Sequence, residues 1–291
     1  MPISAQPHKP PFWPIFGSLV ITLTLVAALW GLYPVWFAAA PPARIAPQEV
    51  TEPRVAEDAT TLFPSLPPSA NMSELPDLTE PVDVAARKQA FYDFLLPLIH
   101  LENERLLIKR AYLSDWLARI TQGEAPDADL LAELMALAED YYIETELDPQ
   151  AMLTQLLYQM DVLPPSMIVA QAANESAWGT SRFATEGNNL FGQWCFTPGC
   201  GLVPQSRPEG ETYEVRAFAS PALSIRAFLL NLNRHHSYED LRDRRAELRA
   251  SGRAATGLDL VPYLLNYSTR REEYVAEITQ TILFNNLQDL D

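Results

Sequence analysis

Apolar and polar positions form three successive patterns along this 291-residue chain. The first is an apolar run over residues 15–33, inside a window without charged side chains between Lys9 and Arg44. The second is a polar stretch over residues 38–82 in which proline recurs. From residue 83 onward, apolar residues recur at the three- and four-residue spacing of an amphipathic helix. The patterns predict an apolar segment, a linker and a mainly helical region.

The apolar run is typical of a membrane anchor. As a helix it would rise about 28 Å, close to a hydrocarbon core of about 30 Å. Both of its ends carry aromatic rings that favour the membrane interface. Ala38–Ala40 resembles a signal-peptidase site, but Pro41 would follow the cut, and the apolar run is longer than the apolar core of a usual signal peptide. We expect a retained signal anchor over residues 15–37, with residues 1–14 in the cytoplasm.

The proline-rich stretch over residues 38–82 also contains many glutamate, serine and threonine residues. Such a segment lacks the apolar content to form a core and favours extended conformations. We expect a disordered linker that holds the following domain away from the bilayer.

The remainder predicts helices with one irregular insertion. Asp127, Asp148 and Pro164 mark helix starts, and Pro97 is expected to kink or split the first helix. Between residues 190 and 218 the helical period stops. The expected elements are helices over 83–121, 127–141, 150–161, 165–178, 221–234, 238–249, 258–267 and 272–287, and a strand over 212–218. The predicted fold class is mainly helical α+β, with a helical subdomain over 83–147 and a second domain over 148–291 that carries a small β-lobe.

Composition narrows the function classes. The net charge of −16 counts against a nucleic-acid binder, which needs a basic face to neutralise phosphates. Two cysteines are too few for a disulfide-rich domain or a four-cysteine zinc site. Cys195 and Cys200 enclose a Pro-Gly turn, which favours a disulfide in an oxidising compartment. The alternative is half of a metal site, for which the sequence offers no second ligand pair, so we expect neither a metal nor an organic cofactor.

Glu175 is the candidate for acid chemistry. On a helix it shares a face with Ile168, Gln171 and Ala172, so its carboxyl group is not expected to face open water. Burial, the absence of an adjacent cation and the negative end of the helix would all raise its pKa. Such a carboxyl suits a general acid for glycosidic cleavage, whereas the alternative is an ordinary glutamate in solvent. Gly179 is expected to adopt the left-handed conformation after the helix.

The residues after Glu175 include several that occur in carbohydrate sites. Trp178, Phe191 and Trp194 offer flat apolar rings for sugars, and Asn188 and Asn189 offer amide donors and acceptors. The alternative is that these residues form tight turns and core.

The sequence AQAANESAWGTSRFATEGNNLFGQW, residues 170–194, resembles the active-site segment of the bacterial glucosaminidase domain, glycoside hydrolase family 73. It is most similar to the Bax branch, membrane-anchored proteins of Gram-negative bacteria. The similarity extends over about residues 164–287 and includes Phe218–Pro221 and Tyr267–Thr269. The resemblance implies a lysozyme-like domain, cleavage of peptidoglycan after N-acetylglucosamine, and Glu175 as the catalytic acid.

The family also has a second carboxylate on a mobile β-lobe, which corresponds here to residues 191–218. Glu214 is our choice for this catalytic role, and Glu211 (also a predicted substrate-binding residue) and Glu209 are the alternatives. A carboxylate about 5–5.5 Å from Glu175 would indicate retention of configuration, and about 6.5–9.5 Å would indicate inversion. If none approaches, the acetamido group of the substrate is the candidate nucleophile.

A family motif, Tyr-Ala-Thr-Asp-Pro-x-Tyr, corresponds to residues 267–274. Here the Asp-Pro pair is lost and residues are gained before Tyr274. By resemblance, Tyr267 lines the cleft and stabilises the transition state through its hydroxyl; the alternative is that both tyrosines pack in the core.

Together these features predict a single-pass inner-membrane protein with its catalytic domain in the periplasm. The expected activity is that of an endo-β-N-acetylglucosaminidase on peptidoglycan glycan strands. The alternatives are a non-catalytic glycan-binding or scaffolding protein, and a muramidase or lytic transglycosylase that cuts the other glycan bond.

Overall fold

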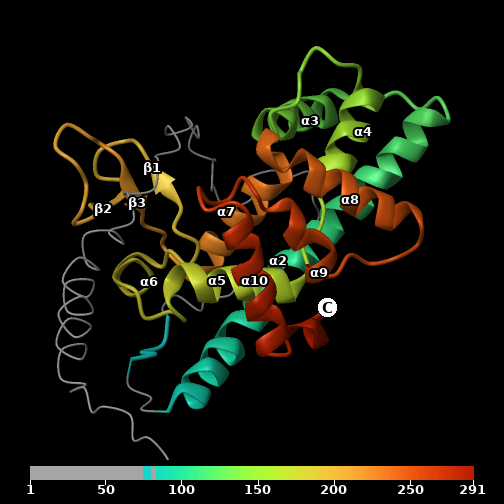
Figure 1. Ribbon diagram of the computed structural model, residues 1–291. Coiled ribbons are helices and arrows are strands. Elements are labelled where there is room, and N and C mark those ends of the chain that lie inside the picture. The colour runs from blue at the N-terminus through green and yellow to red at the C-terminus, as the bar shows by residue number, and fades with distance from the viewer. Residues whose placement is uncertain (1–74, 80–82) are drawn as a thin grey trace, which may run out of the picture. The chain divides into compact units, whose positions relative to one another are not determined.

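The computed structural model describes residues 75–79 and 83–291. The predicted cytoplasmic N-terminus, the signal anchor over 15–37 and most of the linker over 38–82 lie outside the described residues. Within the part described, no helix combines the length and the apolar character needed to cross a bilayer. Helices make up most of this part, and the strands gather beside α6 at one end (Figure 1).

The elements follow the predicted order. The helices are α2 (Val84–Thr121), α3 (Ala128–Asp140), α4 (Pro149–Gln159), α5 (Pro165–Ser176), α6 (Arg182–Gly187), α7 (Pro221–Arg234), α8 (Glu239–Ala250), α9 (Gly257–Leu260) and α10 (Glu272–Phe284). The strands are β1 (Trp194–Cys195), β2 (Gly201–Leu202) and β3 (Glu214–Arg216). Short 3-10 helices are η1 (His236–Tyr238), η2 (Val261–Tyr263) and η3 (Leu287–Leu290).

Helix α2 runs without interruption past Pro97. Asp83 caps its start, since the carboxylate accepts a hydrogen bond from the amide of Ala86 at 3.1 Å. The predicted alternative of a split at Pro97 is therefore wrong. Burial on both sides of the proline holds the helix together, through Phe94, Leu95, Leu98 and Ile99.

Buried apolar residues form two cores, and α2 belongs to both. The first core surrounds α5 and includes Phe91 and Leu95 from the first half of α2. Leu78, which precedes α2, is buried in the same core. The second core lies among α3, α4 and the later part of α2, which supplies Leu113 and Trp116. A single long helix therefore joins the two cores.

Several predicted helices end earlier than the sequence pattern indicates. The helices expected over 150–161, 165–178 and 272–287 end at Gln159, Ser176 and Phe284, and the one expected over 258–267 is the short α9 followed by η2. Pro262 lies in η2 and has no amide hydrogen to continue a helix.

The described strands form an antiparallel sheet in the order β1–β3–β2, the predicted β-lobe. In its register, Cys195 lies opposite Glu214. The strand expected over 212–218 is only three residues long. It ends early because the amide of Phe218 donates to the carbonyl of Gly187 instead of continuing the ladder.

Asp161, buried between α4 and α5, connects several helices. Its carboxylate accepts a hydrogen bond from Nε of Arg249 at 2.7 Å and lies 3.4 Å from Nε of Arg110. Its carbonyl accepts a hydrogen bond from Asn233 at 2.8 Å. These contacts join α2, α7 and α8 around one buried carboxylate. Removing such a carboxylate is costly because the largely buried Arg110 and Arg245 would lose their counter-charge, whereas Arg249 is half-exposed.

We therefore expect Asp161→Asn to lower the free energy of unfolding by about 3 kcal/mol. Urea unfolding followed by circular dichroism measures this change. The control is Asp243→Asn, which alters an exposed carboxylate on α8 and should cost less than about 1 kcal/mol. Equal effects of the two variants would contradict the connecting role of Asp161.

Candidate active site

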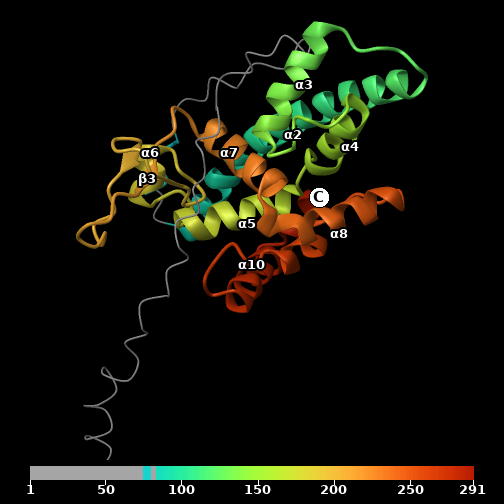
Figure 2. The same ribbon diagram turned by 90° about the horizontal axis from the view of Figure 1, so that it is seen from above.

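Helix α5 carries Glu175 in its last turn. The predicted neighbours on its face, Ile168, Gln171 and Ala172, are all fully buried, whereas Glu175 itself is half-buried. Figure 1 and Figure 2 both show α10 beside α5. The acid therefore lies where a buried helix emerges from the first core, sheltered but not sealed from solvent.

The chain turns sharply directly after the acid. Ala177, Trp178 and Gly179 have φ values of 51°, 60° and 78°, so the left-handed conformation expected for Gly179 begins two residues earlier. Such angles are unfavourable for alanine and tryptophan. Ser176 fixes the turn, because its hydroxyl donates to the carbonyl of Ala172 at 2.6 Å and accepts from the amide of Gly179 at 2.8 Å.

Tyr274 on α10 holds the acid from the side. Nε2 of Gln171 donates to the Tyr274 hydroxyl at 3.0 Å, and that hydroxyl is hydrogen-bonded to Glu175. Since the hydroxyl oxygen accepts from Gln171, its own proton is available for the carboxylate. The chain Gln171–Tyr274–Glu175 thus fixes the orientation of the carboxyl group.

Two further tyrosines complete the surroundings of the acid. The ring of Tyr267 stacks on Tyr274 with centroids 5.3 Å apart, and its hydroxyl donates to the carbonyl of Phe191 at 3.0 Å. The ring centroids of Tyr238 and Tyr267 lie 6.4 Å apart, and both tyrosines interact electrostatically with Glu175. The structure therefore brings the predicted residues Glu175 and Tyr267 together.

Burial raises the pKa of Glu175 above its usual value. The hydrogen bond from Tyr274 and the charge of Arg270 oppose this rise, and the charge of Glu277 adds to it. Burial also raises the pKa of Tyr267 and of Tyr274 well above the ordinary value for tyrosine. The site therefore combines a carboxyl group that holds its proton to higher pH than an ordinary glutamate with tyrosine hydroxyls that ionise less readily than usual.

The loop before the β-lobe brings backbone close to the acid. Gly192 has a φ of 65°, and a Cβ atom at this position would lie 3.4 Å from Oε2 of Glu175. A side chain at Gly192 would therefore be strained by this φ, and its Cβ atom would contact the carboxylate at an ordinary van der Waals distance.

The two predicted asparagines hold this loop together. Nδ2 of Asn189 donates to the carbonyls of Gln193 and Arg216, at 2.8 and 2.9 Å. Nδ2 of Asn188 donates to the carbonyl of Phe218 at 3.0 Å. In the described conformation these amides are used in shaping the loop, which corresponds to the turn-forming alternative.

The three predicted aromatic platforms differ in exposure. Phe191 is buried and stacks on Phe228 with centroids 4.1 Å apart. Trp178 packs edge-on against α2, and Nζ of Lys88 lies 4.5 Å from its ring centre. Trp194 is 47% exposed and stacks on Tyr213. Trp194 is therefore the platform that the structure leaves available to a sugar ring.

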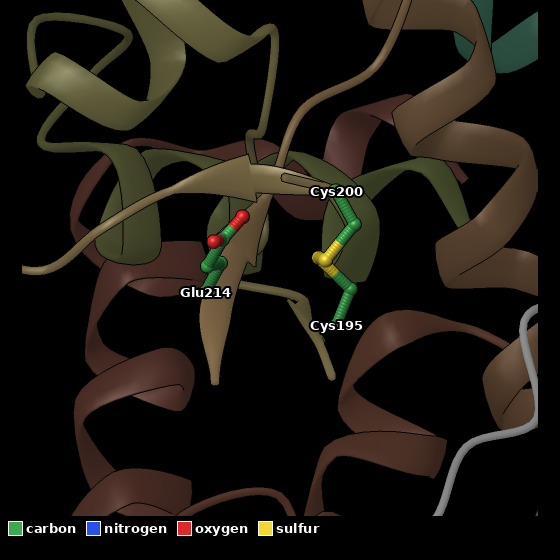
Figure 3. A group of neighbouring side chains, drawn as sticks. All are labelled: Cys195, Cys200 and Glu214. Carbon is green, nitrogen blue, oxygen red and sulfur yellow. A yellow bond between two sulfur atoms is a disulfide. The ribbon is translucent and has the colours of Figure 1, made fainter. Parts of the chain in front are cut away.

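Glu214 lies under the turn that follows β1 (Figure 3). Its two carboxylate oxygens accept hydrogen bonds from the amides of Gly199 at 3.0 Å and Gly201 at 2.7 Å. These bonds lower the pKa of Glu214. In this arrangement the carboxylate stabilises its own lobe, while Glu211 is half-buried and Glu209 is exposed nearby in sequence.

Cys195 and Cys200 form the predicted disulfide beside Glu214 (Figure 3). The three side chains are close enough together to suggest a metal site. Both sulfurs are bonded to each other, however, so neither is a thiolate ligand. The alternative of half a metal site at these cysteines is therefore wrong.

The sequence argument did not assign Tyr274, Tyr238 or Gln171 to the site. Tyr274 follows Tyr267 at a spacing of seven, which fits core packing equally well, and Tyr238 belongs to a separate helix–turn region. Gln171 could have been found from the sequence, because it lies one helical turn before Glu175 on the same face.

We expect Tyr274→Phe to raise the pKa of Glu175 further, because the variant keeps the ring but loses the hydrogen bond to the carboxylate. It also leaves the buried Nε2 of Gln171 without this acceptor, at a cost of about 1–3 kcal/mol in unfolding free energy. Carbon-13 NMR titration of the Glu175 carboxyl and urea unfolding measure the two effects. The control Tyr263→Phe should change neither, and an unchanged Glu175 titration in Tyr274→Phe would contradict the hydrogen bond.

Two comparisons found similarity between this chain and known proteins. The model of the Glucosaminidase family, described as mannosyl-glycoprotein endo-β-N-acetylglucosaminidase, matches residues 150–287. The chain is also 32% identical over 207 residues to Protein bax of Escherichia coli (strain K12), which covers 71% of this chain and 72% of that protein. No solved structure matches the chain. On these findings, the chain belongs to the Bax-like proteins with a glucosaminidase domain.

Proposed function

We propose that this protein is a membrane-anchored peptidoglycan hydrolase, an endo-β-N-acetylglucosaminidase in which Glu175 is the general acid. The observation that carries the proposal is the sheltered carboxyl of Glu175, whose pKa is raised by burial and whose orientation is fixed by Tyr274. Membership of the glucosaminidase family supports a glycosidase acting on cell-wall glycan.

The proposed reaction is a hydrolysis. The carboxylic acid of Glu175 transfers its proton to the glycosidic oxygen, and the bond from that oxygen to the sugar C1 breaks with its electron pair going to the oxygen. Water adds its oxygen to C1 and releases a proton to solvent, and a proton taken up from solvent restores the acid form of Glu175. Once Glu175 is a carboxylate, the Tyr274 hydroxyl stabilises it by a charge-assisted hydrogen bond.

The location of the protein is part of the same proposal. The predicted anchor over 15–37 would place the protein in the inner membrane with its catalytic domain in the periplasm. The disulfide Cys195–Cys200 supports an oxidising compartment.

We expect Glu175→Gln to abolish digestion of purified sacculi by the full-length protein while binding to sacculi is retained. The amide is isosteric but has no acidic proton to transfer, and general acid catalysis contributes about 10²–10⁴-fold. The control Glu186→Gln, an exposed carboxylate on α6, should digest normally. Wild-type binding without digestion would instead indicate a glycan-binding protein.

The reducing ends of the released fragments test which bond is cut. An endo-β-N-acetylglucosaminidase leaves N-acetylglucosamine at the new reducing end. N-acetylmuramic acid, or its anhydro form, at that end would instead assign the protein as a muramidase or lytic transglycosylase.

The raised pKa of Glu175 predicts two pH dependences. The hydrolysis rate should fall as pH rises through this pKa, because the acid loses its proton. The folded protein binds the proton more tightly than the unfolded chain, so its stability should also fall as pH rises between the unfolded and folded pKa values. Initial rates and urea unfolding across a pH series measure both, and Glu175→Gln should remove this contribution to the pH dependence of stability.

The second carboxylate remains a prediction, with Glu214 as the first candidate. Since Glu214 binds the amides of Gly199 and Gly201, we expect Glu214→Gln to reduce their protection from hydrogen exchange together with hydrolysis. Loss of hydrolysis with protection unchanged would indicate direct action on the substrate. Glu211→Gln and Glu209→Gln are the matched comparisons.

A further inference from the structure

Arg270 and Glu277 form an ion pair next to the proposed acid. Nη2 of Arg270 lies 2.7 Å from Oε2 of Glu277, and the two side chains are 47% and 41% exposed. The guanidinium carbon of Arg270 lies 5.9 Å from the ring centre of Tyr274, the residue that binds Glu175. The pair therefore lies next to Tyr274, with both side chains partly exposed although the paired oxygen of Glu277 is itself buried.

Both members of the pair have fixed positions on or just before α10. Glu277 follows Tyr274 by three residues, so the two side chains share one face of the helix. Arg270 precedes α10, within the stretch where the motif Tyr-Ala-Thr-Asp-Pro-x-Tyr is altered in this chain. The cation is therefore a feature that this chain adds between the two tyrosines of that motif.

The charges of Arg270 and Glu277 act on Glu175 in opposite directions. The other groups that face the acid are the hydroxyls of Tyr274, Tyr238 and Tyr267 and the amide of Asn174, and all of these are neutral. Arg270 and Glu277 are thus the charged groups in this set, and the remaining groups are neutral.

We propose that Arg270 and Glu277 are positioning residues that act on Glu175 as an opposed charge pair, Arg270 favouring release of its proton and Glu277 favouring retention. Their mutual ion pair keeps the two charges together beside Tyr274. The catalytic meaning of this pair rests on the proposed function, whereas its effect on the protonation of Glu175 does not.

Opposite signs make the proposal distinguishable from a purely structural role. In Arg270→Gln the acid should retain its proton to higher pH, and in Glu277→Gln it should lose the proton at lower pH. Each midpoint should move by about 0.5 pH unit, as expected for one partly solvated charge near the acid. The double variant should return close to the wild-type midpoint, because both contributions are removed.

Carbon-13 NMR titration of the Glu175 carboxyl in the full chain measures these midpoints directly. The spectrum of Glu175→Gln assigns the signal, and thermal unfolding verifies that each variant is folded. The matched controls are Arg271→Gln and Glu273→Gln, exposed neighbours of the same charges, which should move the midpoint far less. In parallel, the high-pH limb of kcat/KM on sacculi should shift in the same directions.

Shifts of opposite sign in the two single variants, with cancellation in the double variant, would support the charge pair. Shifts of the same sign, or shifts no larger than those of the controls, would overturn it. If the titration shifts as expected while Glu175→Gln still digests sacculi, the charge pair stands and the proposed function fails. If the titration midpoints do not shift and Glu175→Gln is inactive on sacculi, the proposed function stands and the charge pair fails.

Discussion

The contact between α5 and α10 is the interaction on which the site depends. It places the Tyr274 hydroxyl between a fully buried amide, Gln171, and the half-buried carboxyl of Glu175. A carboxyl group at a helix end in water would ionise as an ordinary glutamate. Here the packing of two helices removes much of its water and leaves a directed hydrogen bond in exchange, so its orientation and its protonation have one common cause.

The β-lobe is held by a different set of interactions. Its short strands offer little apolar surface, and its shape depends on the disulfide Cys195–Cys200, the bonds from Glu214 to the turn, and the amide of Asn189. The lobe is also tied to neighbouring helices, since the amide of Phe218 donates to the carbonyl of Gly187 in α6 and the Ser224 hydroxyl of α7 donates to Gln193. Its first strand presents the exposed ring of Trp194.

The sequence predicts those parts of the site that depend on residues close together in the chain, and misses those that depend on distant ones. The helical period correctly placed Glu175 on a buried face, because that face is set by residues within two turns of it. The same reasoning could not find Tyr274, whose partner lies about a hundred residues earlier in the chain. The sequence also could not decide the role of Asn188 and Asn189. A side-chain amide can bind a sugar or a backbone carbonyl equally well, and only the fold shows that carbonyls are their partners.

Alternation along a strand shows similar limits. It predicted a strand around Glu214 but not the glycine amides that the Glu214 carboxylate binds. At the helix end, the choice of Gly179 for the left-handed position followed propensity, yet Ala177 and Trp178 adopt that conformation too because Ser176 and the core hold them there.

The passage of α2 through both cores has a consequence for how the protein could be divided. A fragment beginning at residue 148 would contain the whole segment that matches the glucosaminidase family, yet it would lack Phe91, Leu95 and Leu78. Their absence would leave part of α5 and the turn around Gly179, against which the Leu78 side chain packs closely, open to water. The segment that matches the family model therefore shares its hydrophobic core with the chain that precedes it.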